Sequence, residues 1–391
     1  MSLEIRDKSA SPRVACQKQH ECGARDYDVV HMTSVHPAFD SRIFHKMAVS
    51  LAQSGRRVGL VVPHDRDEQV NGVSVLAVGK SNGRLGRFFV TSWRVAQRAW
   101  KTRAPICHFH DPELMPAAIG LRILGRKVVF DLHEDLPQQI VTKTWIPSVL
   151  RYPIGRVSAL AEWVTARIVN RVVAATPVIA ARFPKDKTVV VQNFPILGEL
   201  EYERADAAAV PKSRVVCYVG GVGRVRGCVE MVRTLECVDA ELLLAGPFET
   251  QKTRAQLNGM KAWGKVDYRG IVDRTGVRDI LNSSRAGLVV LHPEPNYIAS
   301  QPIKLFEYMS AGLPVIASDF PLWRKIVDGA GAGLLVDPLN PEEIAAAIEW
   351  VFDNEEEAQA MGARGKKAVR DIYNWGHEEA KLLTMYDELS R

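Results

Sequence analysis

No segment of the 391-residue chain is apolar over the roughly 20 residues that a membrane-spanning helix needs. Residues 1–26 also lack the apolar core of a secretory signal, because they are polar and of mixed charge. We therefore expect a disordered tail over residues 1–26 and a cytoplasmic protein. The six cysteines include no C-x-x-C pair, which argues against a zinc ribbon or a thioredoxin-like site. Cys16, His20 and Cys22 lack a fourth ligand, so we interpret them as part of the tail with reduced thiols.

Acidic residues are scarce in the first half of the chain. Residues 1–200 carry 28 Lys and Arg against 17 Asp and Glu, whereas residues 201–391 carry 23 against 28. A basic first half indicates an anionic partner, which nucleic acid, an anionic lipid surface or a phosphate-bearing acceptor would satisfy.

Short apolar strands alternate with helices, which predicts parallel sheets covered on both faces. The alternation is interrupted between residues 193 and 213, where two prolines, a charged patch and an alanine run occur. We therefore expect an α/β fold of two facing, Rossmann-like, doubly wound domains, with ligands in the cleft between them. The expected parts are an N-terminal domain (27–195), a linker (196–212), a C-terminal domain (213–372) and a last helix returning to the first domain (373–391).

A glycine-rich turn follows the strand predicted over residues 214–219. Backbone N–H groups in such a turn can approach a phosphate closely, and Arg224 and Arg226 add positive charge there. The glycines do not match G-x-G-x-x-G, so a dinucleotide fingerprint is weak and a tight turn with solvated arginines is the alternative.

The segment 301–312 is the second candidate phosphate site. Pro302 lies at or just before the start of a helix predicted over 304–310, where its missing N–H costs little. The free N–H groups of residues 303–305 then point at the cleft, and Glu307 lies one turn further in. Its carboxylate can accept hydrogen bonds from two sugar hydroxyls, while Gly312 ends the helix.

Histidines form the third candidate group. His108 and His110 share one face of a strand, His133 follows the next strand, and His36 follows the first. We interpret His108 and His133 as structural, with His133 near the cleft, and His110 as either a cleft residue or a helix cap.

These segments resemble glycosyltransferase family 4, a group 1 family of the GT-B fold. The resemblance runs from about residue 28 over nearly the whole chain, and its most specific block is 302–319. Its other blocks are 40–44, 107–113, 131–135 and 269–272. It implies that the second domain holds a UDP- or GDP-linked sugar and that the first holds a glycan or lipid-linked acceptor.

The resemblance also implies residue roles. The ribose-binding glutamate of the family's E-x7-E motif matches Glu307, whereas Ala299 replaces the motif's first glutamate. Arg226 matches the second member of the family's diphosphate pair, and Arg224 is a substitute for the first. The implied site is catalytic His110, Arg224 and Arg226; nucleotide-sugar residues Gly221, Gly223, Gly270, Val272, Pro302, Ile303, Lys304, Leu305 and Glu307; and acceptor-side residues Asp40, Arg42 and His133.

The implied chemistry is retaining transfer by front-side attack, because the family pattern has no carboxylate nucleophile for a double displacement. We expect no metal, since a pattern as short as the D-x-D at Asp65 and Asp67 arises by chance in most chains of this size. We also expect no cofactor beyond the nucleotide sugar. We expect a role in bacterial-type polysaccharide or lipopolysaccharide synthesis and no nucleic-acid binding. The alternatives are an epimerase on the same fold, a non-catalytic nucleotide-sugar binder, and a metal-dependent hydrolase using His108, His110, Asp111 and His133.

A helix predicted over residues 85–103 has two interpretations. It can lie on an anionic membrane, because basic residues surround its aromatic side chains. It can also be an ordinary helix whose apolar stripe faces the core and whose basic side is solvated. The residues concerned are Arg84, Arg87, Arg94, Arg98, Lys101 and Arg103 around Phe88, Phe89, Trp93 and Trp100, with further charge at Lys143, Arg151, Arg156, Arg167 and Arg171.

Overall fold

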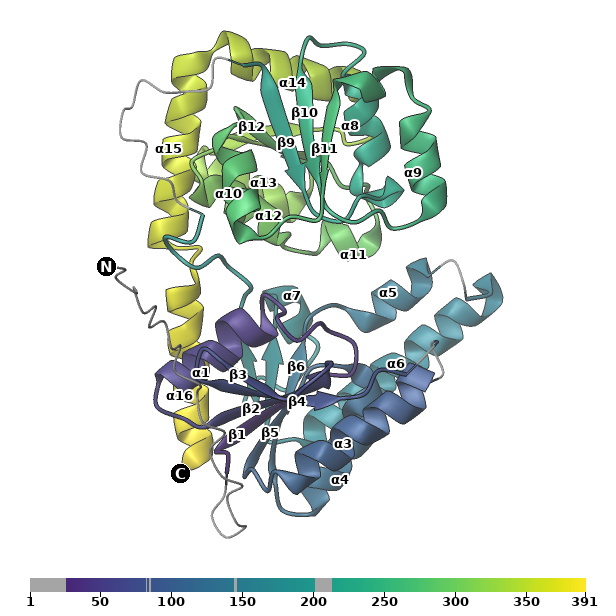
Figure 1. The fold of residues 1–391 in the computed structure, drawn as a ribbon, viewed down its shortest axis with the longest axis vertical. Helices are drawn as coiled ribbons and strands as arrows, with labels where there is room; N and C mark the ends of the chain where they lie inside the picture. Colours follow the sequence, from purple (N-terminus) through teal and green to yellow (C-terminus); the bar gives the residue numbers. More distant parts are fainter. Residues whose placement is uncertain (1–25, 82, 84–85, 144–145, 201–212) are drawn as a thin grey trace, which may run out of the picture.

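The structure, a computed structural model, describes residues 26–81, 83, 86–143, 146–200 and 213–391 (Figure 1). The tail with Cys16, His20 and Cys22, most of the expected linker, and Arg84 lie outside the described residues. Among the described residues, no helix is both long enough and apolar enough to span a bilayer.

The first domain is built on an eight-stranded sheet in the order β3-β4-β2-β1-β5-β6-β7-β8. All neighbours pair in parallel except β3 with β4. The strands are β1 (Val29–Met32), β2 (Val58–Pro63), β3 (Glu68–Val70), β4 (Val73–Val78), β5 (Ile106–Phe109), β6 (Lys127–Leu132), β7 (Arg171–Ala174) and β8 (Thr188–Val190). The sequence did not predict β3 and β8, because strands of three residues are too short to show a periodicity.

Helices cover both faces of this sheet. They are η1 (Ile43–Ala48), α1 (Val49–Gln53), η2 (Gly86–Thr91), α3 (Ser92–Lys101), η3 (Pro112–Leu114), α4 (Met115–Ile123), α5 (Leu136–Thr142), α6 (Ser148–Ile168) and α7 (Pro177–Ala180). Helix α6 begins at Ser148 and contains Pro153.

The aromatic stripe on η2 and α3 faces away from the core. Phe89 and Trp93 are 65% and 69% exposed, whereas Val95 and Ala99 are buried against the sheet. The interpretation of a core-facing aromatic stripe is therefore wrong, since small aliphatic residues on the other side of the helix fill the core.

The second domain has a six-stranded parallel sheet in the order β11-β10-β9-β12-β13-β14. Its strands are β9 (Val215–Val219), β10 (Glu241–Ala245), β11 (Val266–Gly270), β12 (Ala286–Val289), β13 (Val315–Ser318) and β14 (Gly333–Val336). Its helices are η4 (Arg224–Arg226), α8 (Cys228–Thr234), α9 (Gln251–Asn258), η5 (Lys261–Lys265), α10 (Arg274–Asn282), α11 (Pro295–Ile298), α12 (Ile303–Ser310), α13 (Pro321–Ala330), α14 (Pro341–Asp353) and α15 (Glu355–Asp371). Buried apolar layers lie on both faces of the sheet. The expected fold class, two doubly wound α/β domains, is confirmed.

The last helix, α16 (Trp375–Ser390), leaves the second domain and packs on the first sheet (Figure 1). The Trp375 indole N–H donates to Ser50 Oγ at 2.9 Å, and the Tyr386 hydroxyl meets His108 Nδ1 at 2.7 Å. The C-terminus thus completes the core beneath the first domain's histidines.

Candidate functional site

A cavity of about 530 Å³ lies between the two domains, where loops at the carboxyl ends of both sheets meet. This is the position in which open α/β sheets bind ligands. We call it the interdomain cavity. Its lining from the first domain includes Asp40, Arg42, His133, Glu134 and Asp135, and its lining from the second includes Gly220, Arg226, Arg274, Tyr297, Pro302, Ile303, Lys304 and Glu307.

The N-terminus of α12 forms one wall of this cavity. Pro302 is the N-cap residue, and no side chain caps the helix. The first N–H groups and the positive end of the helix dipole therefore remain available to an anion. Lys304 is buried beside this end, with its Nζ 5.2 Å from the centre of the Tyr218 ring. Burial, reinforced by the charge of Arg226, lowers the pKa of Lys304 to about 8.

Glycine at position 220 is required by Lys304. Gly220 has φ +149°, and a Cβ there would lie 3.0 Å from Lys304 Cε. A larger residue would strain the backbone at this positive φ and would shift the end of the lysine side chain by a few tenths of an ångström.

Arg226 is the other cation of this wall. Its Nε donates to Glu249 Oε1 at 2.8 Å, and its side chain reaches the cavity. A Cβ on Gly223 would lie 2.0 Å from Glu249 Oε2, so glycine is needed for Glu249 to hold the arginine. The neighbouring Arg224 is exposed and does not line the cavity. The structure therefore brings Arg226, but not Arg224, to Lys304.

Glu307 lines the cavity one turn into α12 and is paired with Arg274. Arg274 Nη1 donates to Glu307 Oε1 at 2.7 Å. The same guanidinium donates from Nε and Nη2 to both oxygens of Glu199, each at 2.8 Å. Glu307 Oε2 has no partner among the described residues, so it can accept a ligand hydroxyl. No sequence pattern pointed to Arg274, because its contact with Glu199 depends on the path of residues 194–200.

Five residues expected at the nucleotide site do not line the cavity: Gly221, Gly223, Gly270, Val272 and Leu305. Leu305 is fully buried in the core, and Val272 packs partly buried against that core. Gly270, with φ +68°, ends β11. A Cβ on Gly221 would lie 3.4 Å from Arg226 Nε, which places this glycine behind the arginine.

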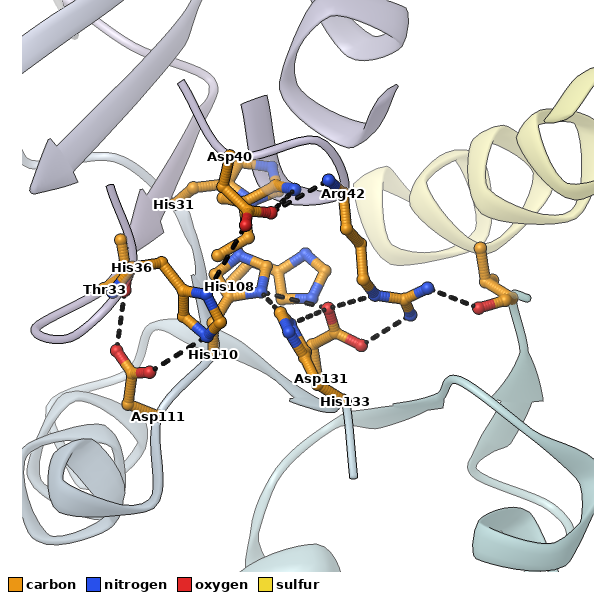
Figure 2. Close-up of polar contacts among 12 residues, drawn as sticks. His31, Thr33, His36, Asp40, Arg42, His108, His110, Asp111, Asp131 and His133 are labelled. Atoms are coloured by element: carbon orange, nitrogen blue, oxygen red, sulfur yellow. Dashed lines mark hydrogen bonds and ion pairs between the residues drawn. The ribbon is translucent and has the colours of Figure 1, made fainter. Parts of the chain in front are cut away.

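On the opposite wall, Asp131 organises the polar side chains of the first domain (Figure 2). Arg42 donates to both carboxylate oxygens, from Nη2 at 2.8 Å and from Nε at 3.2 Å. His133 Nε2 lies 2.9 Å and His110 Nδ1 3.0 Å from Oδ2. Burial acts to raise the pKa of Asp131, but Arg42 and the histidines outweigh it and hold this pKa well below its usual range.

His110 lies beneath the cavity and does not line it. It is 4% exposed, and its Nε2 lies 2.9 Å from His31 Nδ1. Burial keeps the pKa of His110 below its ordinary value, although Asp131 opposes this shift. His133, which was expected near the cleft on the acceptor side, lines the cavity. His110 therefore supports His133 and Asp131 from below.

His36 and Asp40 extend the network toward the surface of the first domain (Figure 2). His36 Nδ1 is 3.5 Å from Asp40 Oδ2, and its Nε2 is 3.4 Å from Asp111 Oδ1. Burial opposes protonation of His36, but the Asp40 and Asp111 carboxylates outweigh burial and raise its pKa. Asp40 also accepts from the Arg42 and Ile43 backbone N–H groups at the start of η1.

Two overlapping groups of described residues have the composition of metal ligands: His31, His108 and His110, and His110, Asp131 and His133. Arg42 already occupies both Asp131 oxygens, and Asp111 accepts from Thr33 Oγ1 and the Ser34 N–H. The carboxylates that a hydrolytic metal would need are thus committed to protein donors. Asp67, from the D-x-D pattern, accepts from Ala77 N–H and pairs with Arg98 away from the cavity.

Comparison with known proteins gives a family match and a fold match. The sequence model described as "Glycosyl transferases group 1" matches residues 201–368. A phosphatidyl-myo-inositol mannosyltransferase of Mycobacterium leprae is 27% identical over 158 residues, which are 40% of this chain and 40% of the relative. The match thus spans about two fifths of that relative's length.

Two solved structures share the fold over nearly the whole chain. Sucrose-phosphate synthase from Thermosynechococcus elongatus has a TM-score of 0.76 at 19% identity, covering 92% of this chain and 98% of that one. Anabaena HepE in complex with UDP-glucose has a TM-score of 0.72 at 14% identity, covering 92% and 99%. At these identities the likeness shows the fold alone.

Proposed function

Because residues 201–368 match the group 1 glycosyltransferase model, we propose that the chain is a glycosyltransferase that moves a sugar from a UDP- or GDP-linked donor to a glycan or lipid-linked acceptor. The observation that carries this proposal is the interdomain cavity. One wall presents the N-terminus of α12, the side chains of Lys304 and Arg226, and the Glu307 carboxylate to a nucleoside diphosphate. The facing wall offers a hydrogen-bonded histidine and Asp40 to the reacting sugar and its acceptor.

In this proposal, the N-terminus of α12, Lys304 and Arg226 hold the diphosphate, and Glu307 binds the ribose hydroxyls. Negative charge develops on the diphosphate as the sugar leaves. Fixed donors in a partly buried cavity stabilise such charge more strongly than water does. We propose a retaining, front-side, metal-independent course, which rests on the family resemblance, with the leaving diphosphate accepting the proton of the acceptor hydroxyl.

His133 is the histidine we assign to the sugar and acceptor side. Its Nε2 contacts Asp131 at 2.9 Å and lies 3.1 Å from His110 Nδ1, so its ring orientation is fixed from beneath. His110 then acts through His133 rather than by touching the sugar.

The test of the function is nucleotide release from UDP- and GDP-hexoses, measured with and without lipid or glycan fractions as acceptors. We expect release that depends strongly on an acceptor fraction. Donor isomerisation without an acceptor would instead identify an epimerase, and nucleotide binding without any turnover would identify a non-catalytic binder.

We further propose that the protein contacts an anionic membrane through what we call the basic–aromatic face. This face comprises the exposed side chains of η2, α3, α4 and α6, which lie side by side in Figure 1. Its exposed apolar members include Phe88, Phe89, Val90, Trp93, Trp100, Ile123, Val157, Leu160 and Trp163, and Leu124 follows α4 directly. The only acidic residue of these four helices is Glu162, which is buried and paired with Arg182. Exposed aromatics with arginines and no exposed acid fit an anionic lipid surface.

Vesicle sedimentation tests this face. Each basic residue near an anionic surface contributes about 1 kcal/mol, so Arg94→Gln with Arg156→Gln is expected to weaken binding to phosphatidylglycerol-containing vesicles roughly 30-fold. The matched control is Arg233→Gln with Arg254→Gln, two exposed arginines of the second domain, which is expected to bind as the wild type does. Equal losses of vesicle binding in the two double variants would contradict the assignment. So would wild-type binding to neutral vesicles that is as strong as its binding to anionic vesicles.

A further inference from the structure

A second cavity, of about 540 Å³, opens in the first domain. Its walls are residues 34–39 after β1, Pro63 and His64 at the end of β2, Lys80 and Ser81 after β4, and Thr91 at the end of η2. We call it the Lys80 pocket. Like the interdomain cavity, it lies beyond the carboxyl ends of parallel strands, where this architecture binds ligands.

Two hydroxyl groups in the wall of the Lys80 pocket lack hydrogen-bond partners. Thr91 is 1% exposed, and neither its Oγ1 nor Ser81 Oγ has a partner among the described residues. Buried hydroxyls are normally hydrogen-bonded, because leaving one unpaired forfeits its interaction with water. Two such hydroxyls in one cavity wall are available to donate hydrogen bonds to a ligand.

The charge of the wall determines what kind of ligand fits. Lys80 is exposed and makes no hydrogen bond or ion pair with the described residues, and among those same residues no Asp or Glu lines the pocket. His64 contributes a ring whose Nε2 is already paired with Glu68 Oε1 at 2.6 Å. An ammonium group and two free hydroxyl donors, without a carboxylate, favour a ligand with several acceptor oxygens and negative charge, which a phosphate monoester or diester supplies.

The Lys80 pocket is connected to the interdomain cavity by His36. His36 lines the pocket, and its ring centre lies 4.8 Å from that of His133, which lines the interdomain cavity. His36 also contacts Asp40, which faces the interdomain cavity (Figure 2). A molecule anchored in the pocket can therefore extend past His36 to the place where the sugar is transferred.

We propose that the Lys80 pocket holds the phosphate group of the acceptor, with Lys80, Ser81 and Thr91 donating hydrogen bonds to its oxygens. This assignment rests on the proposed function, since it gives the pocket a substrate of that reaction. The phosphate belongs to either a water-soluble sugar phosphate or a lipid head group. In the lipid case the tail would leave along η2, whose Phe88 and Phe89 are exposed.

The experiment titrates sn-glycerol 3-phosphate into the protein by ligand-observed NMR, with neutral glycerol as the comparison. We expect glycerol phosphate to bind and glycerol not to bind. Lys80→Met is expected to weaken binding at least tenfold, because it removes a charge-assisted hydrogen bond. Thr91→Val is expected to weaken it severalfold without lowering the melting temperature, because valine has the shape of threonine and the lost hydroxyl has no partner among the described residues.

Controls separate this proposal from the donor site. Lys325→Met, an exposed lysine on α13, is expected to leave glycerol phosphate binding unchanged. Lys80→Met is expected to leave UDP and GDP binding unchanged. Glu307→Ala is expected to weaken nucleotide binding while preserving glycerol phosphate binding. A wrong assignment of the donor site can therefore be distinguished from a wrong assignment of the Lys80 pocket.

The proposal is overturned if glycerol phosphate does not bind, if Lys80→Met behaves like Lys325→Met, or if glycerol binds as tightly as its phosphate. A last arm replaces the probe with n-dodecyl phosphate below its micelle concentration. Tighter binding of the dodecyl compound supports a phosphate from a lipid head group, and equal or weaker binding supports a phosphate from a soluble sugar phosphate.

Discussion

Replacing Arg226 by methionine is expected to lower the turnover number of sugar transfer about 10²- to 10³-fold, the range found when one fixed donor to a developing negative charge is removed. Arg226 reaches the interdomain cavity beside Lys304 and is held in place by Glu249 at 2.8 Å. The loss arises because the leaving diphosphate acquires charge that only fixed cations and N–H groups can stabilise there. Steady-state kinetics with a saturating donor measures this effect.

Arg224→Met is the control for this prediction. Arg224 is two residues away, is also arginine, and is exposed outside the cavity lining. A small effect in Arg224→Met beside a large one in Arg226→Met supports the assignment, and the reverse order would contradict it.

The pH dependence of the affinity for the donor tests the role of Lys304 in the same wall. Burial lowers the pKa of this lysine to about 8, and only its protonated form attracts a diphosphate. Affinity for the donor is therefore expected to be full below that pH and to fall as the pH rises through about 8. In Lys304→Gln the affinity should be weaker throughout, and this fall should be absent.

Replacing Asp131 by asparagine is expected to destabilise the first domain by about 3–5 kcal/mol, because it leaves the charge of Arg42 buried without its partner. Asp131 is 1% exposed and Arg42 is 3% exposed, and the pair is joined by hydrogen bonds of 2.8 and 3.2 Å. His110 and His133 lose a hydrogen-bond acceptor in the same variant. Urea unfolding followed by circular dichroism measures the change in the free energy of unfolding.

Asp28→Asn is the matched control for the buried pair. Asp28 binds Arg57 through the same two guanidinium nitrogens, at 2.7 and 3.2 Å, but both side chains are largely exposed. Exposed ion pairs contribute little to stability, so this variant is expected to unfold nearly as the wild type does. Similar losses in Asp28→Asn and Asp131→Asn would show that burial is not the reason for the effect.

The fold and the α12 wall could be predicted because their signals are local in the sequence. Apolar strands alternate with helices, and Pro302, Lys304 and Glu307 lie within one turn and a half of the same helix. The helix predicted over residues 304–310 is α12, which begins one residue earlier at Ile303 and ends at Ser310. Local patterns of this kind do not depend on how distant parts of the chain meet.

The facing wall could not be predicted in the same way, because its contacts join residues far apart in the sequence. Arg42 and Asp131 are separated by 89 residues, and His108 meets Tyr386 across 278. A histidine lines the cavity only if its strand ends close to the cavity surface. Hydrophobic periodicity does not show how far each strand end lies below that surface. The Lys80 pocket likewise depends on Thr91 facing inward while Phe89 and Trp93 face outward.

The central claim is that Glu307 on α12 binds the ribose of the donor nucleotide, and calorimetric titration of UDP and GDP into Glu307→Ala and Glu199→Ala tests it most directly. Both carboxylates bind Arg274, but only Glu307 lines the interdomain cavity. Losing a charged acceptor of ribose hydroxyls is expected to raise the Kd of the preferred nucleotide roughly 10- to 100-fold in Glu307→Ala. The Kd in Glu199→Ala is expected to stay within about twofold of the wild type, because only its pairing with Arg274 is lost. Unchanged affinity in Glu307→Ala, or equal losses in both variants, would contradict the account.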